Sequence, residues 1–212
     1  RRFLDVDADD ELALSGHGWA HLQTGQLERA QEDYARLVER HPDSQEYAYF
    51  LSLARRETPE SQPVSLVMRN VESYAARFDD WVGGALGYYA PRRVAEMIRE
   101  AYPKGNGSVL DLGCGTGMLA AYLGPITGSI VGVDLSTTML DQAAQRHYDR
   151  LHHCDIRDAL RDTPDMQYEV IAACDVFIYL GKLDEHVGSA ARILRPNGRI
   201  IATFEQSDDA PY

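Results

Sequence analysis

The sequence predicts an α/β domain built on a parallel β-sheet, with a short α-helical segment in front of it. Short apolar runs alternate with helical stretches from Val109 onward, which is typical of repeated strand–helix–strand units. A glycine-rich turn at 113–117 directly follows the first apolar run, a context that places a ligand at the carboxyl end of a parallel strand. The 212 residues suffice for one such domain and a smaller appendage.

Composition limits the classes of partner and compartment. The formal net charge of -12 disfavours binding to the phosphate backbone of nucleic acids. No run approaches the roughly 18 apolar residues that a membrane span needs. The three cysteines, Cys114, Cys154 and Cys174, are an odd number in apolar or glycine-rich stretches, which suits a reducing compartment. We therefore expect a cytoplasmic protein that binds neither nucleic acid nor membrane.

The first predicted unit, residues 1–57, is helical. Two amphipathic stretches lie within residues 12–41, and the apolar Ala30 and Tyr34 recur at helical spacing. Pro42 ends the second stretch because a proline cannot continue a helix. We expect a pair of helices joined by a short turn.

This helical pair resembles a tetratricopeptide repeat of about 34 residues. Gly18 matches the small residue where the two helices pack closest, and Gly25 falls in the turn. Two departures are His17, where a leucine is usual, and the displaced Trp19. Residues 44–56 match the start of a second repeat. Because stable arrays need about three repeats, we expect the segment to dock onto the main domain, a second copy or further repeats.

Two uses of this segment stay open: a groove that binds a protein partner, or a packing and self-association element. His17 and His21 lie four residues apart on one helix, a spacing that can ligate zinc. The sequence lacks the accompanying acidic residue of the metalloprotease pattern, so we interpret this surface as a polar helix face. His147, His152 and His153 likewise have no clustered carboxylates, and we expect no metal site.

Residues 58–65 contain two prolines and no apolar periodicity, which predicts a linker. The main domain is then expected over residues 66–212, with 66–103 as a helical lid or cap. Within the cap, Tyr74, Phe78 and Trp81 fall on one helical face. We expect Phe78 and Trp81 in the core, whereas Tyr74 could either pack on the sheet or cover a ligand.

The glycine turn indicates the kind of ligand. An acidic residue, Asp111, precedes Gly113 by two positions, and a second apolar run over residues 129–134 ends in Asp134. Such an acid, about twenty residues beyond the turn, can accept hydrogen bonds from ribose hydroxyls. The spacing Gly-x-Gly-x-Gly differs from the Gly-x-Gly-x-x-Gly of dinucleotide sites. Acidic strand ends therefore favour a cationic adenosyl ligand over a pyrophosphate.

Residues 111–117 (Asp-Leu-Gly-Cys-Gly-Thr-Gly) resemble the first motif of class I S-adenosylmethionine-dependent methyltransferases, and residues 131–143 resemble the second. The resemblance covers about residues 66–207 and is closest in kind to methyltransferases of types 11 and 12. It implies a Rossmann-like sheet with helices on both faces. It also implies S-adenosylmethionine as cofactor and S-adenosylhomocysteine as product.

The resemblance implies a set of cofactor-binding residues at the strand ends. Asp134 would hold the ribose, Leu135 and Met139 would flank the adenine, and Asp155 and the Ile156 amide would meet its edge. Asp134 and Asp155 could instead only cap the following helices. The full implied set is Tyr74, Asp111, Gly113, Cys114, Gly115, Gly117, Asp134, Leu135, Met139, Asp155, Ile156 and Asp175.

Three more strands are predicted, over residues 151–154, 168–175 and 200–204. A helix is expected to open at 181–184 and end at Leu194. The turn at 195–199 resembles the Leu-Lys-Pro-Gly-Gly turn of the family. The family fold adds two strands after the fifth, so we expect this sheet to lack them or to be completed by another chain.

The sequence assigns no catalytic residue. Asp175, Tyr179 and His186 follow the fourth strand, where substrates bind in this fold, but none is a clear general base. The segment after Cys174 lacks the Asn-Pro-Pro-Tyr pattern of nucleobase or glutamine methylation. We predict methyl transfer to a small molecule or a protein. The alternatives are an inactive cofactor-binding module that recruits partners through the helical repeat, and a nicotinamide-dependent oxidoreductase, which the glycine spacing disfavours.

Overall fold

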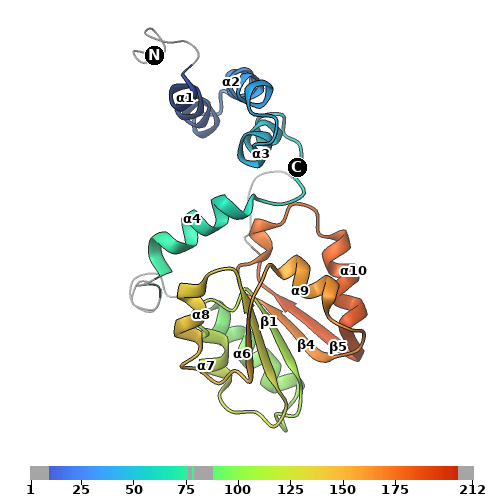
Figure 1. Ribbon diagram of the computed structural model, residues 1–212. Coiled ribbons are helices and arrows are strands. Elements are labelled where there is room, and N and C mark those ends of the chain that lie inside the picture. Colours follow the sequence, from blue (N-terminus) through green and yellow to red (C-terminus); the bar gives the residue numbers. More distant parts are fainter. Residues whose placement is uncertain (1–9, 76–77, 79–87, 205–212) are drawn as a thin grey trace. The chain divides into compact units, whose positions relative to one another are not determined.

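The computed structural model describes residues 10–75, 78 and 88–204. The chain forms two compact units (Figure 1). Of the described residues, the first unit contains those up to Val67 together with Leu180–Lys182, and the second contains those from Met68 to Tyr179 and from Leu183 to Phe204. The predicted positions of Trp81 and of the segment after Phe204 lie outside the described residues.

Three helices make up most of the first unit: α1 (Glu11–Gln23), α2 (Leu27–Arg40) and α3 (Gln45–Ala54). The Asp10 carboxylate caps α1 by accepting a hydrogen bond from the Ala13 amide at 2.7 Å. The Ser44 hydroxyl caps α3 in the same way. The predicted helical pair and the helix after it are therefore confirmed.

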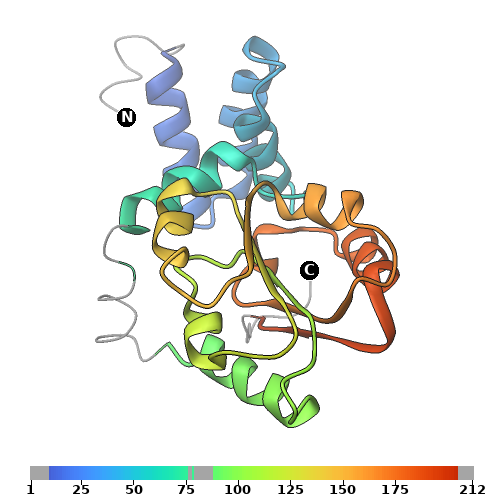
Figure 2. The same cartoon turned by 60° about the horizontal axis from the view of Figure 1, so that its bottom comes forward.

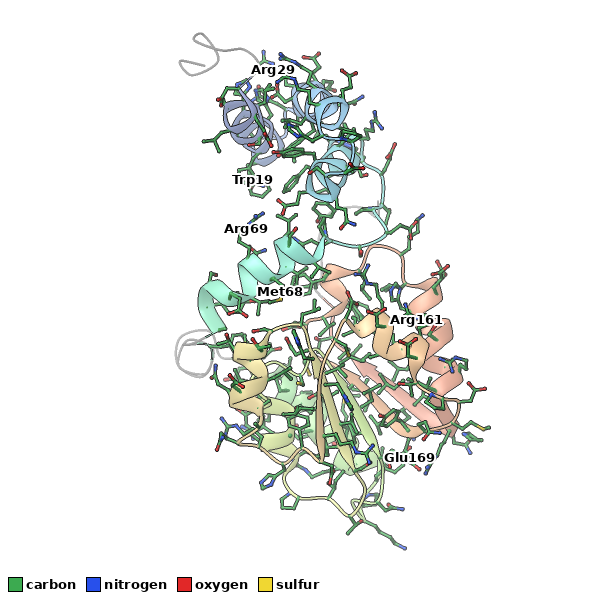
Figure 3. All side chains as sticks on the ribbon, viewed as in Figure 1. Trp19, Arg29, Met68, Arg69, Arg161 and Glu169 are labelled. Atoms are coloured by element: carbon green, nitrogen blue, oxygen red, sulfur yellow. The ribbon has the colours of Figure 1, made fainter. Side chains whose placement is uncertain are left out.

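The helices of this unit pack around a small core. A Cβ atom on Gly18 would lie 2.9 Å from the Tyr34 ring, so α1 has no room for a side chain here against α2. Gly25 adopts a φ of 71° in the intervening turn. Trp19, on α1, is 48% exposed and meets the Phe50 ring edge-on (Figure 3). The buried apolar residues of this core are Leu14, Ala30, Tyr34, Leu37, Leu51 and Ala54.

The predicted linker is shorter than expected. Helix α4 (Val64–Tyr74) begins directly after Pro63. Ser61 forms an isolated antiparallel bridge with Leu180, and the Gly181 amide donates to the Glu60 carbonyl at 3.1 Å. The segment 180–182 therefore pairs with the linker instead of opening a helix, and the helix expected there begins at Asp184.

The second unit is built on a five-stranded parallel sheet with the order β3-β2-β1-β4-β5. The change of direction in strand order lies between β1 and β4, the place where open parallel sheets bind ligands. The buried apolar residues of β1 and β4 explain their central position. The strands are β1 (Val109–Leu112), β2 (Ile130–Asp134), β3 (Arg150–His153), β4 (Tyr168–Ala173) and β5 (Leu194–Ala202).

Helices cover both faces of this sheet (Figures 1 and 2). One face carries α6 (Ala90–Ala101), α7 (Met118–Leu123) and α8 (Thr137–Ala143). The other carries α9 (Ile156–Asp162) and α10 (Asp184–Ile193). This is the predicted Rossmann-like arrangement. Within the described part of the chain, no helix combines the length and hydrophobicity needed to cross a bilayer.

The edge strand β5 differs from the prediction. It begins at Leu194, six residues earlier than expected, and Leu194 pairs with Tyr168. The pairing then jumps so that Arg199 lies opposite Val170. Asn197, between them, has a φ of 65°, which few side chains other than glycine adopt readily. The predicted turn is therefore an irregular segment within the strand.

Candidate cofactor site

The glycine turn connects β1 to α7 and needs glycine for two different reasons. Gly113, Gly115 and Gly117 have φ values of 63°, 53° and 86°, in the left-handed region that favours glycine. A Cβ atom on Gly113 would also overlap with Val176. At Gly115, by contrast, no heavy atom lies within 4 Å of an added Cβ. The turn therefore packs tightly on one side and is open on the other.

Asp134, at the end of β2, is held by this turn. Its Oδ2 atom accepts a hydrogen bond from the Gly115 amide at 2.8 Å, and its Oδ1 atom accepts one from the Ser136 amide at 2.8 Å. Ser136 itself caps α8, with its hydroxyl accepting from the Met139 amide at 3.1 Å. Asp134 is therefore not needed as the helix cap. The Leu135 amide is a third backbone donor to this carboxylate, which still has capacity for a further donor among its roughly four lone-pair sites.

Asp111 is the most buried acid of the site. The Tyr148 hydroxyl donates to its Oδ2 atom at 2.5 Å. Burial raises the pKa of Asp111 to about 7, against the effect of the Tyr148 hydrogen bond and with a further contribution from the Asp134 charge. Burial also raises the pKa of Asp134, while backbone amides and His153 oppose this shift. Among the described residues, no lysine or arginine charge contributes to either shift.

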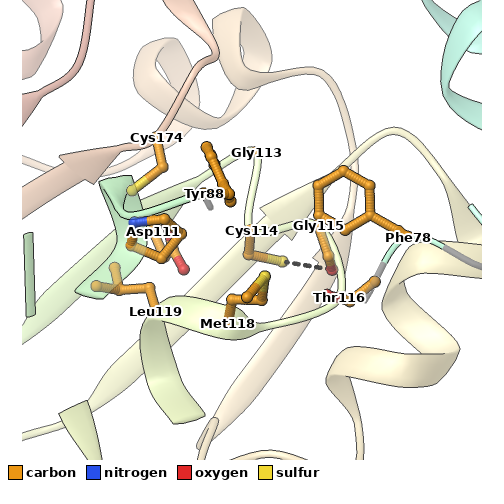
Figure 4. A pocket seen from close by; sticks show the side chains of 11 residues that line it. Phe78, Tyr88, Asp111, Gly113, Cys114, Gly115, Thr116, Met118, Leu119 and Cys174 are labelled. Carbon is orange, nitrogen blue, oxygen red and sulfur yellow. Dashed lines mark hydrogen bonds between the residues drawn. The ribbon is translucent and has the colours of Figure 1, made fainter. Parts of the chain in front are cut away.

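A cavity of about 60 Å³ lies beside the turn (Figure 4). Asp111 and the thiols of Cys114 and Cys174 border it on the sheet side, and the rings of Phe78 and Tyr88 border it from the cap. Burial, with nearby carboxylates, raises the pKa of both thiols, so they are neutral and poor nucleophiles. The remaining lining residues are Pro91, Gly113, Gly115, Thr116, Met118 and Leu119.

Asp175, beyond the end of β4, has a φ of 53°, which is uncommon for a side chain other than glycine. The Thr203 hydroxyl fixes it, because it accepts from the Asp175 amide at 2.8 Å and donates to Asp175 Oδ1 at 2.6 Å. The Tyr88 hydroxyl donates to the same carboxylate. Strained backbone that its surroundings hold in place is common at functional sites.

The end of α4 lies against the second motif. The Glu72 carboxylate accepts hydrogen bonds from the hydroxyls of Ser136 at 2.5 Å and Thr138 at 2.9 Å. Tyr74 is hydrogen-bonded to Tyr179, whose pKa is raised by burial, then by Tyr74 and by the charges of Asp175 and Asp134. Helix α4 therefore brings Tyr74 to the ends of β2 and β4.

The acid that follows β3, Asp155, has different partners from those of Asp134. Asp155 caps α9 by accepting from the Arg157 amide at 2.8 Å, and its carboxylate also pairs with the Arg157 guanidinium at 3.0 and 2.5 Å. Burial opposes ionisation, but Arg157 lowers the pKa of Asp155 below its usual value. Ile156 is the first residue of α9. The capping interpretation of Asp155 is therefore confirmed, and a contact with adenine stays a prediction.

The two residues expected beside the adenine flank the end of β2. The Leu135 carbonyl is hydrogen-bonded to His153 Nε2 at 2.8 Å. Met139 is buried in the first turn of α8. Leu135 directly follows Asp134 and Met139 lies five residues after it, and the contact of either residue with a base stays a prediction.

Sequence reasoning did not assign Tyr148, Tyr88 or Glu72 to this site. Tyr148 lies 37 residues from its partner Asp111, so no local pattern relates them. Phe78 was expected in the core, but it is only half-buried and borders the cavity, which corrects that expectation. For Phe78 and Tyr88, the sequence signal was that both are aromatic residues of the predicted cap, which precedes the glycine turn.

Comparisons with known proteins agree with this geometry. Residues 110–200 match a protein-family model described as a methyltransferase domain. Over 66 residues, the chain is 42% identical to the dTDP-3-amino-3,6-dideoxy-alpha-D-glucopyranose N,N-dimethyltransferase of Streptomyces fradiae, covering 31% of this chain and 26% of that protein. It is 23% identical over 171 residues to the ubiquinone biosynthesis O-methyltransferase of a Chelativorans species, covering 70% and 67%. Most other matches span about half or less of the curated relative's length.

Solved structures show the same fold. An S-adenosylmethionine-dependent methyltransferase of Methanococcus maripaludis described as putative has a TM-score of 0.52 at 18% identity, covering 62% of each chain. The [4+2]-cyclase SpnF has a TM-score of 0.56 at 19% identity, covering 68% of this chain and 61% of that one. The family match and the sheet order together support a class I methyltransferase fold for residues 110–200. The cofactor of such domains is S-adenosylmethionine.

Proposed function

We propose that the chain transfers the methyl group of S-adenosylmethionine to an oxygen or nitrogen atom of a small molecule. The observation that carries this proposal is the pair Asp111 and Asp134. Their carboxylates lie beside an open glycine turn, and no lysine or arginine among the described residues neutralises them. A ligand that brings a positive charge and ribose hydroxyls complements such a site.

The residues present fit the parts of this cofactor. Asp134 would accept hydrogen bonds from the ribose hydroxyls through the lone pairs that its backbone donors leave unused. Asp111 and Gly113 would face the charged methionine end, next to the cavity. Leu135 and Met139 would border the adenine. Tyr74, fixed by Tyr179, would cover the site from α4.

When bound, S-adenosylmethionine supplies a methyl group on a positively charged sulfur, which is a good leaving group. The chain then has to align the acceptor and exclude water. Phe78 and Tyr88 provide an apolar border for this purpose, and Asp175 holds Tyr88 in place through the Tyr88 hydroxyl. The acceptor's proton leaves only if the nucleophilic atom carries one.

The choice of a small-molecule acceptor rests on the relatives. One acts on a dTDP-linked amino sugar, and others are O-methyltransferases of ubiquinone biosynthesis. A protein acceptor is the second candidate, because a pair of helices that could bind a protein partner precedes the domain. The similarity to a cyclase makes a direct assay necessary, since the fold also carries a reaction of another class.

The test has two stages. Calorimetry should show binding of S-adenosylmethionine and S-adenosylhomocysteine but not NAD, and Asp134→Asn should weaken both. Release of S-adenosylhomocysteine is then followed with amino sugars, phenols and a peptide library as acceptors. Cofactor binding with no turnover for any acceptor would contradict methyl transfer and favour the inactive binding module. An absence of cofactor binding would contradict the whole assignment.

A further inference from the structure

The first unit contains a group of three potential metal ligands that the local sequence pattern does not reveal. His17 and His21 lie one turn apart on α1, and Asp33 faces them from α2. One ligand atom from each residue lies within 4.8 Å of the others. The acid missing from the local pattern of the two histidines therefore comes from the neighbouring helix.

The geometry of this group is close to that of a metal site. The Asp33 Oδ2 atom lies 3.1 Å from His17 Nδ1 and 3.0 Å from His21 Nδ1. The two imidazole rings are 4.0 Å apart between centroids. In a tetrahedral zinc site with bonds of about 2.0–2.2 Å, ligand atoms are separated by about 3.4 Å. The two Asp33–histidine distances differ from this value by a few tenths of an ångström, and rotation of the two imidazoles, whose ligand atoms lie within 4.8 Å of each other, would complete the site.

Burial gives a second argument. Asp33 is 8% exposed and His21 is 7% exposed, whereas the His17 side chain is 30% exposed. A carboxylate that is nearly buried needs strong compensation, and a bound metal ion would supply it. The polar helix face expected from sequence is therefore wrong at His21. The more open side at His17 leaves room for a water molecule as a fourth ligand.

We propose that His17, His21 and Asp33 bind one zinc ion, with water in the fourth position. The ion would join α1 to α2 close to Gly18, which packs against the Tyr34 ring of α2. Small domains with little core commonly depend on such a metal. The buried apolar cluster between α1, α2 and α3 contains six described residues, so packing of these helices contributes little stability and a metal crosslink would add to it.

The first experiment uses the full chain freed of metal by a chelator. Zinc is titrated by calorimetry, the bound metal is measured by mass spectrometry, and cobalt is substituted as a spectroscopic probe. We expect one ion per chain and the visible absorption of four-coordinate cobalt. Bound metal well below one per chain would overturn the proposal and leave a group held by hydrogen bonds alone.

The second experiment uses Asp33→Asn and His17→Gln. We expect each to weaken zinc binding more than about 100-fold, because loss of even an outer-shell partner costs about 10–100-fold. The matched control is His41→Gln, in the same unit, where His41 pairs with Glu11 at 3.3 Å outside the group. Zinc should raise the melting temperature of the wild type and the control only.

Equal zinc affinity in Asp33→Asn, His17→Gln and the wild type would also overturn the proposal. If Asp33→Asn does not fold, the more exposed His17→Gln decides the question alone. None of these readouts depends on cofactor binding, so failure here leaves the function proposed for the second unit unaffected.

Discussion

The ends of β2 and β3 present two acids that look alike in the sequence and differ in the structure. Asp134 is held by the backbone amides of Gly115 and Ser136, and burial raises its pKa. Asp155 caps a helix and pairs with Arg157, and its pKa is lowered. An acid with its own cation is already satisfied, whereas one oriented only by amides is available to a ligand. We therefore expect cofactor affinity to depend on Asp134 far more than on Asp155.

The largest effect is expected from Gly113→Ala, because this substitution strains the turn whose Gly115 amide holds Asp134. Positive φ and overlap with Val176 should together lower the free energy of unfolding by about 3 kcal/mol or more. Urea denaturation measures this change. The control Gly188→Ala, on an exposed part of α10 with nothing near its added Cβ, should be neutral or stabilising. Similar stabilities for the two variants would show that the turn is not rigid.

The next effect concerns affinity. Asp134→Asn should weaken binding of S-adenosylmethionine about 100-fold, because hydrogen bonds to a charged group contribute about 1.5–3 kcal/mol each. Calorimetry at constant pH gives the dissociation constant. An unchanged constant in a folded variant would remove Asp134 from the site and reverse the comparison.

A smaller effect is expected from pH. Free Asp111 carries a proton below about pH 7, and a cationic ligand favours the ionised form. Affinity for S-adenosylmethionine should therefore rise as the pH increases from roughly 6 to 8, by up to about tenfold. Binding below pH 7 should release a proton, detectable by calorimetry in buffers of different ionisation enthalpy. Asp111→Asn should abolish this dependence, and a persistent slope would assign it to another group.

The smallest effect is expected from Asp155→Asn. Asparagine still caps a helix, so the loss is the partly exposed ion pair with Arg157, worth on the order of 1 kcal/mol or less. The affinity for S-adenosylmethionine should change less than about threefold, which is about 0.6 kcal/mol. A loss as large as that in Asp134→Asn would instead support the predicted adenine contact of Asp155.

Features that depend on neighbouring residues in the sequence were predicted more accurately than features that depend on tertiary contacts. The glycine turn, β1 and α7 depend on neighbouring residues, so their positions could be predicted closely. The start of β5 could not, because residues 195–198 leave the pairing and Leu194 pairs with Tyr168 from a distant segment. The Rossmann-like sheet was implied by the family resemblance, and its strand order comes from the structure.

The site residues differ in the same way: those with a local sequence pattern were predicted, and those placed by tertiary contacts were not. Asp111 and Asp134 end apolar runs and were visible in the sequence. Tyr148 reaches Asp111 across 37 positions, and Asp33 reaches His17 and His21 across 16 and 12. Such contacts arise from tertiary packing, which a single sequence does not encode in any local pattern.

The burial of Asp111 has a practical consequence for spectroscopy. A carboxyl group that keeps its proton absorbs infrared light as a carbonyl, and this band disappears when the proton leaves. With isotope-edited aspartate, the β1 strand would therefore carry its own vibrational reporter. The arrival of a positively charged molecule could then be timed without attaching a dye to the protein.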